Sequence, residues 1–83
     1  MPIIEGYVKN ADSGLGIPRV EITLSGTSGV FKGVTDNNGY YKIQVPAGFY
    51  TLMVREREYE PITEGITVSA NVRKDIYIRR ITF

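Results

Sequence analysis

Apolar and polar side chains alternate along most of this 83-residue chain. Between residues 19 and 24, for example, Val20, Ile22 and Leu24 alternate with arginine, glutamate and threonine. Because successive side chains of an extended strand point to opposite faces of a sheet, this spacing is typical of strands with one buried face. No segment combines the apolar spacing of about 3.6 residues with the capping residues of a helix. We therefore expect an all-β protein with no helix.

The alternation predicts seven short strands. They are expected at residues 4–9, 19–24, 30–35, 40–45, 50–55, 66–68 and 72–81. One flat sheet of seven strands would leave a large apolar face in water, so two sheets packed face to face are the more stable arrangement. The chain is thus predicted to be a β-sandwich whose inward-facing residues are Ile4, Val8, Val20, Ile22, Leu24, Tyr41, Ile43, Val45, Tyr50, Leu52, Val54, Ile66, Val68, Ile76 and Ile78.

Turn-forming residues separate the predicted strands. Asp36 is expected to accept hydrogen bonds from turn amides, while Gly39 adopts a backbone conformation that a Cβ atom would disfavour. Pro46 and Gly48 are predicted to form the next reversal. Tyr50 follows at an inward position, and we interpret it as a scaffold tyrosine whose hydroxyl holds a neighbouring loop, as in the tyrosine corner of other sandwiches.

The sequence contains no histidine, no cysteine and no tryptophan. Zinc sites built on imidazole or thiolate, disulfides, Ser-His-Asp triads and cysteine nucleophiles are therefore all excluded. Ten Lys and Arg residues against nine Asp and Glu residues give a net charge of +1, which argues against a nucleic-acid-binding surface. We predict that the protein is not an enzyme and that it has no catalytic residues, no cofactor and no metal site.

The length of the chain predicts one domain spanning residues 1–83. The longest uninterrupted apolar run is only a few residues, far short of the roughly 20 needed to cross a bilayer, so no membrane insertion is expected. The first residues lack the basic region followed by an apolar stretch that marks a secretory signal. The absence of cysteine fits a reducing cytosol, a bacterial surface domain or a virion protein equally well.

Four short motifs occur in order along the chain. They are Ile-x-Gly-x-Val at 4–8, Gly-x-Gly-Ile-Pro-x-Val-x-Ile-x-Leu at 14–24, Thr-Asp-x-x-Gly at 35–39 and Val-Pro-Ala-Gly-x-Tyr at 45–50. In this order and spacing the motifs resemble the carboxypeptidase regulatory-like domain, over residues 3–78. More distantly, they resemble the Cna protein B-type repeat of bacterial surface proteins.

This resemblance implies a seven-stranded, transthyretin-like Greek-key sandwich. It also implies a non-catalytic structural or interaction module of a larger surface or virion assembly, or of a multidomain enzyme. The expected partner is then a protein or a neighbouring domain, and the expected location is extracellular, on a cell surface or in a virion. The histidine-dependent hydrolysis of the transthyretin-related hydroxyisourate enzymes is excluded, because this chain has no histidine.

Two polar segments contain residue types that are found in metal or glycosidase sites. The Asp-Asn-Asn segment at 36–38 offers one carboxylate and two amides, whereas Ca²⁺ takes about six to eight oxygen ligands, so a plain turn is the better interpretation. The glutamates at 56, 58 and 60 are interleaved with Arg55 and Arg57. This pattern favours a solvated, charged strand end over the paired carboxylates of a glycoside hydrolase.

The last predicted strand is basic, with arginine or lysine at positions 73, 74, 79 and 80. In a chain of net charge +1, these residues are more simply explained as solubilising than as a site for an acidic partner. Lys74 lies close in sequence to Asn71 and Asp75, which suggests an isopeptide bond of the Cna B type. That bond is disfavoured, because no isolated acid falls on an inward position and a buried unpaired charge is costly.

Several aromatic residues fall on predicted outer faces, namely Tyr7, Tyr40, Tyr59 and Tyr77, together with Phe31 and Phe49. Cross-strand aromatic pairing is the simpler interpretation, and a surface that docks a protein or stacks on a sugar is the functional one. The alternative function is therefore a carbohydrate-binding module that uses exposed tyrosines. A small chain that forms homo-oligomers through its edge strands is a further alternative.

Overall fold

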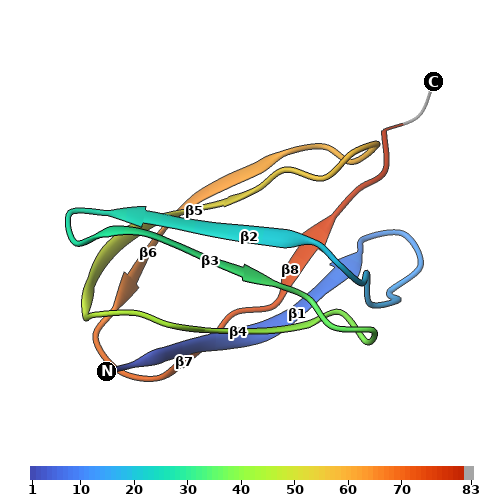
Figure 1. Ribbon diagram of the computed structural model, residues 1–83. Helices are drawn as coiled ribbons and strands as arrows, with labels where there is room; N and C mark the ends of the chain where they lie inside the picture. The colour runs from blue at the N-terminus through green and yellow to red at the C-terminus, as the bar shows by residue number, and fades with distance from the viewer. Residues whose placement is uncertain (82–83) are drawn as a thin grey trace.

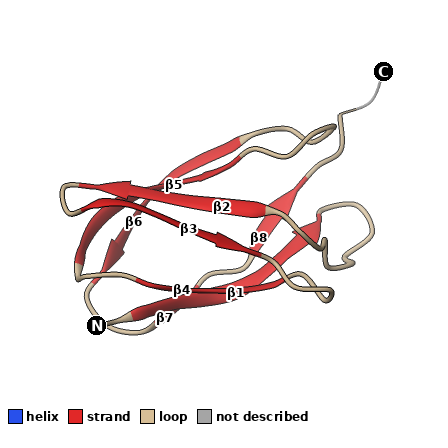
Figure 2. Ribbon diagram, viewed as in Figure 1, coloured by secondary structure: helices blue, strands red, loops and turns tan. Residues whose placement is uncertain are grey.

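The computed structural model describes residues 1–81, which form eight strands and no helix (Figures 1 and 2). The strands pack as two layers with the apolar side chains between them, which confirms the predicted all-β sandwich. In chain order they are β1 (Ile3–Asn10), β2 (Glu21–Gly26), β3 (Gly29–Val34), β4 (Tyr40–Gln44), β5 (Gly48–Val54), β6 (Ile62–Val68), β7 (Val72–Arg73) and β8 (Ile76–Ile78).

The first sheet is built around β1. On one side β1 pairs with β4 in the antiparallel direction, and on the other it pairs with β7 and then β8, both in the parallel direction. The second sheet has the order β3-β2-β5-β6, and all of its neighbouring strands are antiparallel. The first and last strands of the described chain therefore run side by side in the same direction (Figure 1).

The core between the two sheets consists of the predicted inward-facing residues. All of them are buried except Ile66, which is partly buried and packs against the core. The core of the described chain also contains one polar side chain, Thr35, which the alternation does not reveal. Its hydroxyl donates to the Ile17 carbonyl oxygen at 2.7 Å and accepts from the Val20 amide at 2.8 Å, so its polar atom is satisfied.

The strand boundaries differ from the prediction at the C-terminal end. The single strand expected at 72–81 is divided into β7 and β8, which gives eight strands rather than seven, and it ends at Ile78. Strand β6 begins at Ile62, earlier than expected. None of the described residues forms a helix that is long and apolar enough to span a membrane.

Candidate functional site

The outer face of the first sheet presents a pair of tyrosines. Tyr7 on β1 and Tyr40 on β4 are opposite each other in register, and both side chains point away from the core. Their ring centroids are 5.4 Å apart and the rings meet edge to face at 64°. Such pairs stabilise a sheet by about 0.5–1.5 kcal/mol beyond the area that they bury, so this pair is a structural contact whose two rings are only partly exposed.

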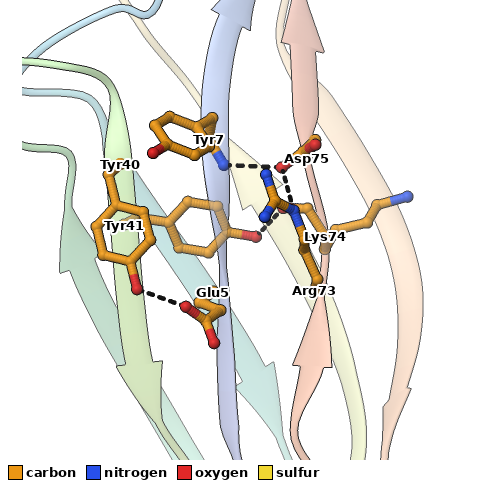
Figure 3. Close-up of polar contacts among 7 residues, drawn as sticks. All are labelled: Glu5, Tyr7, Tyr40, Tyr41, Arg73, Lys74 and Asp75. Carbon is orange, nitrogen blue, oxygen red and sulfur yellow. Dashed lines mark hydrogen bonds and ion pairs between the residues drawn. The ribbon is translucent and has the colours of Figure 1, made fainter.

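The Tyr40 hydroxyl is held by a carboxylate. It donates a hydrogen bond of 2.6 Å to Oε1 of Glu5, which lies on β1 (Figure 3). This hydrogen bond to the carboxylate raises the pKa of Tyr40, and desolvation raises it further. The hydroxyl of Tyr40 is therefore oriented toward Glu5 as a hydrogen-bond donor.

Two cations lie over the Tyr7 ring. Lys9 Nζ is 5.4 Å and Arg73 Cζ is 5.6 Å from the ring centroid, which is the distance range of cation–π contacts. Arg73 Nε is also 3.4 Å from Oδ1 of Asp75, and the same oxygen accepts a 3.1 Å hydrogen bond from the Tyr7 amide (Figure 3). The face of Tyr7 is thus occupied by side chains of the chain itself.

Tyr77 extends this surface, whereas Tyr59 does not. Tyr77 on β8 is the register partner of Lys9, and 54% of it is exposed. We call Tyr7, Lys9, Tyr40, Arg73 and Tyr77 the tyrosine face. Tyr59 instead lies in the loop before β6, where it packs partly against the core and forms an isolated bridge with Arg80.

The two phenylalanines lie elsewhere. Phe49 is 63% exposed on the outer face of the second sheet, where its ring lies against Gly65. Phe31 packs against the core and meets Tyr50 edge to face at 6.0 Å and 81°. The expectation of an outward Phe31 is therefore wrong, because an inward position on the edge strand β3 gives its ring an apolar neighbour.

The predicted turn residues surround the start of β4 and the start of β5. Asp36 Oδ1 accepts from the amides of Asn38 and Tyr40, at 2.8 and 3.0 Å. Gly39 has a φ of +85°, which favours glycine. The Tyr50 hydroxyl donates a 2.5 Å hydrogen bond to the carbonyl of Pro46. Gly48 is already the first residue of β5.

Residues 74 and 75 separate β7 from β8, and we call them the β7–β8 junction. The register with β1 is the same on both sides of this junction, since Ile4 pairs with Val72 and Val8 pairs with Ile76. The Lys74 amide still donates to the Glu5 carbonyl at 2.8 Å. The Lys74 carbonyl, however, accepts the Tyr41 hydroxyl at 2.5 Å, and the Tyr7 amide bonds to the Asp75 carboxylate instead of a backbone oxygen (Figure 3). A side chain thus replaces one backbone partner of β1.

The Lys74 side chain leaves this junction toward the second sheet. Its ammonium is 2.6 Å from Glu64 Oε2 on β6, and both side chains are partly exposed. Burial raises the pKa of Tyr41 well above its usual range, and the carboxylates of Asp75 and Glu64 raise it further. The Lys74 ammonium is thus engaged in a surface ion pair with Glu64. The expectation that no acid falls on an inward position is therefore wrong, because Glu64 lies on the inward side of β6, in phase with Ile62 and Ile66.

The described residues contain little that resembles a reactive centre. Within residues 1–81, no group of three or more His, Cys, Asp and Glu side chains is placed to hold a metal. Every buried side-chain nitrogen or oxygen of the same residues has a hydrogen-bond partner. A hollow lies on the outer face of the second sheet, lined by Glu21, Thr23, Met53 and Arg55. The tyrosine face therefore remains the main candidate for recognition.

Comparison with known families places this chain. Residues 3–79, which include all eight strands and the tyrosine face, match the model of the carboxypeptidase regulatory-like domain. The chain belongs to this family. The resemblance of its motifs is thereby confirmed, and the β7–β8 junction is part of the regulatory-like domain. Among curated protein sequences, none matches this chain.

Solved structures share the fold of this regulatory-like domain at low sequence identity. The Bacillus anthracis TIE protein is 22% identical with a TM-score of 0.79, over 96% of this chain and 17% of the other. The 5-hydroxyisourate hydrolase of Klebsiella pneumoniae is 16% identical with a TM-score of 0.75, over 99% and 93%. BcpA, the major pilin subunit of Bacillus cereus, is 19% identical with a TM-score of 0.73, over 96% and 30%.

These likenesses identify the fold as a transthyretin-like sandwich. The regulatory-like domain spans less than a third of the TIE protein and of the pilin subunit, so it corresponds to one part of those longer chains.

Proposed function

We propose that this regulatory-like domain is a non-catalytic structural and interaction module of a larger surface or virion assembly, or of a multidomain enzyme. We further propose that residues 1–83 form a single domain. The absence of histidine and cysteine supports the first proposal, since it removes the residue types on which most nucleophilic and metal-assisted catalysis relies. The similar fold within a pilin subunit also supports it.

The parallel pairing of the first and last strands is the main observation in support of a structural role as a spacer. Because β1 and β8 run in the same direction, the chain enters the sandwich at one end and leaves β8 at the other (Figure 1). The principal extents of the molecule are 38 × 21 × 16 Å. Neighbouring segments of a longer protein would therefore be held apart along the long axis, as a spacer requires.

Tandem copies test the spacer role. Chains of one, two and four copies, joined by the same proline-rich linker, would be compared by small-angle X-ray scattering. After subtraction of the linker length, we expect the maximum dimension to increase by about the 38 Å of the long axis for each added copy. An increase of 21 Å or less for each copy would contradict an in-line arrangement.

We assign the tyrosine face as the interaction surface of the module, with a protein partner. A sugar stacks on an open aromatic face, but Lys9 and Arg73 already lie over Tyr7, and Tyr40 meets Tyr7 at 64°. Tyrosine with flanking arginine is also the composition that is enriched at protein interfaces. Carbohydrate binding through the exposed Tyr77 remains the second candidate, because that ring is 54% exposed.

Two alanine variants distinguish these partners. Tyr77→Ala removes an exposed ring from the tyrosine face, and Phe49→Ala removes a similarly exposed ring from the opposite sheet as the matched control. We expect no binding of the parent domain on a glycan array. Glycan binding that is lost in Tyr77→Ala and kept in Phe49→Ala would favour the carbohydrate candidate instead.

A further inference from the structure

Strand β1 is hydrogen-bonded along its whole length to the segment 71–78. At its start, the Ile3 amide donates to Asn71 Oδ1 at 3.0 Å, and just beyond its end the Ala11 amide donates to the Ile78 carbonyl at 2.8 Å. Between these two points β1 pairs with β7 over Ile4 and Glu5 and with β8 over residues 8–10. The contact thus extends from residue 3 to residue 11.

Side chains maintain this contact where the two short strands are interrupted. At the β7–β8 junction, the Asp75 carboxylate accepts the Tyr7 amide, and the Lys74 amide donates to the Glu5 carbonyl. The Tyr41 hydroxyl bonds the Lys74 carbonyl from the neighbouring strand β4, which ties the junction to a third strand (Figure 3). The pairing is therefore continuous despite the break in β-structure.

Apolar side chains reinforce the same contact from the core side. Ile4 and Val8 on β1 are fully buried, and so is Ile78 on β8, with Ile76 3% exposed. Sliding β1 along β8 would move these side chains out of their packed positions together. Both the hydrogen bonds and the packing thus oppose displacement along the strand direction.

We propose that β1, β7 and β8 act as a mechanical clamp that resists a force pulling the two ends of the chain apart. Because the strands are parallel, such a force displaces β1 in one direction and β8 in the other. The hydrogen bonds between parallel strands are evenly spaced along the pair, and a force along the strands shears the two strands past each other, so it loads all of these bonds at once instead of one after another. The module would then transmit tension as well as separate its neighbours, which the spacer role alone does not require.

Single-molecule pulling in two directions tests the clamp. The chain contains no cysteine, so introduced cysteines provide unique attachment points. In the first geometry, the handles are attached to the two ends of the chain. In the second, one handle is attached to the N-terminus and the other to Ala70→Cys, an exposed turn position near Met1 at the same end of the sandwich. The second geometry separates β1 from β7 starting at one end.

The proposal predicts a clear difference between the two directions. At the same pulling speed, we expect the unfolding force in the end-to-end geometry to be on the order of twice the force in the second geometry, or more. The reason is that forced unfolding depends on the barrier along the direction of pulling. Chemical denaturation must give the same stability for both labelled chains, so that the fold itself is not the variable. Equal unfolding forces in the two geometries would overturn the clamp.

A pair of variants at Asp75 tests the junction. Asp75→Asn keeps an Oδ1 acceptor for the Tyr7 amide, whereas Asp75→Ala removes it. We expect Asp75→Ala to lower the end-to-end unfolding force and Asp75→Asn to keep most of it. An Asp75→Ala chain that unfolds at the force of the parent would overturn the role of the junction. Neither outcome depends on the scattering result for tandem copies, so a failed clamp and a failed spacer are distinguishable.

Discussion

The carbonyl oxygen of Lys74 determines which residue can stand at position 6. A Cβ atom added to Gly6 would lie 2.1 Å from that oxygen and 2.6 Å from its carbonyl carbon. Both atoms belong to the backbone, so they cannot move without displacing the β7–β8 junction. Gly6 is therefore required by the close approach of two chain segments and not by its φ angle, which is not positive.

We expect Gly6→Ala to destabilise the domain by about 1–3 kcal/mol or more, as overpacking of a closed contact does. The free energy of unfolding in urea is the measurement. Gly48→Ala is the matched control, since the nearest atom to an added Cβ there is 3.9 Å away. Equal stability of the two variants would contradict the close approach at Gly6.

Tyr41 makes the free energy of unfolding of the domain decrease in the alkaline pH range. Its pKa is raised in the folded state by burial, so above about pH 10 the unfolded chain loses this proton more readily than the folded one. The contribution of Tyr41 is therefore fully present below about pH 10 and is lost as the pH rises toward its folded-state pKa.

Tyr41→Phe should lower the free energy of unfolding at pH 8 by about 0.5–1.5 kcal/mol, because the Lys74 carbonyl loses its donor. Between pH 10 and pH 12 the variant should lose less stability than the parent. Urea denaturation across this pH range measures both effects, with Tyr77→Phe as an exposed control. A parallel decline of the parent and Tyr41→Phe would refute the assignment.

The sequence predicted the strand boundaries where apolar residues face inward and polar residues face outward. It did not predict them where a polar residue lies on the inward side of a strand. The inward side of β6 carries Glu64 between Ile62 and Ile66, and this acid conceals the first half of the strand from an alternation of apolar residues. Its carboxylate is accommodated by Lys74, which is remote in sequence. Similarly, Asp75 has the polarity of an outward strand residue, so nothing in the local pattern reveals that its side chain replaces a backbone partner.

Edge strand β3 has one charged side chain, and charges on an edge strand discourage pairing with other chains. Lys32 is its single charged residue, and it is 3.8 Å from Glu21 on β2. We expect Lys32→Val to increase self-association, because it leaves an uncharged apolar edge. Its effect on the stability of the monomer should be below about 1 kcal/mol, since the ion pair is exposed.

Light scattering at two concentrations measures this association, with Lys32→Arg as the control that keeps the charge. A mass of Lys32→Val that does not change with concentration would argue against protection of the edge. Association of the parent itself through the same edge would instead favour the homo-oligomer alternative.

At the scale of the molecule, the two-layer architecture and nearly the whole core follow from the alternation, because burial of one strand face is a local property of the sequence. The tyrosine face follows only in part. Tyr7 and Tyr40 share a sheet face because the register of β1 and β4 pairs them, and this register is a long-range property. Tyr59 is also a tyrosine, but it lies in a loop, where the alternation of a strand does not determine which way its side chain points.

The N-terminal start of β1 and the C-terminal end of β8 lie at opposite ends of the sandwich, and this also limits how the fold can be rearranged. Many domains have neighbouring termini, which permits circular permutation and insertion into a loop of a host protein. Here a bridging peptide would have to run back along a molecule 38 Å long, which takes about 11 extended residues. This sandwich is therefore better suited to end-to-end fusion between other domains than to insertion into a loop of a host protein or to circular permutation.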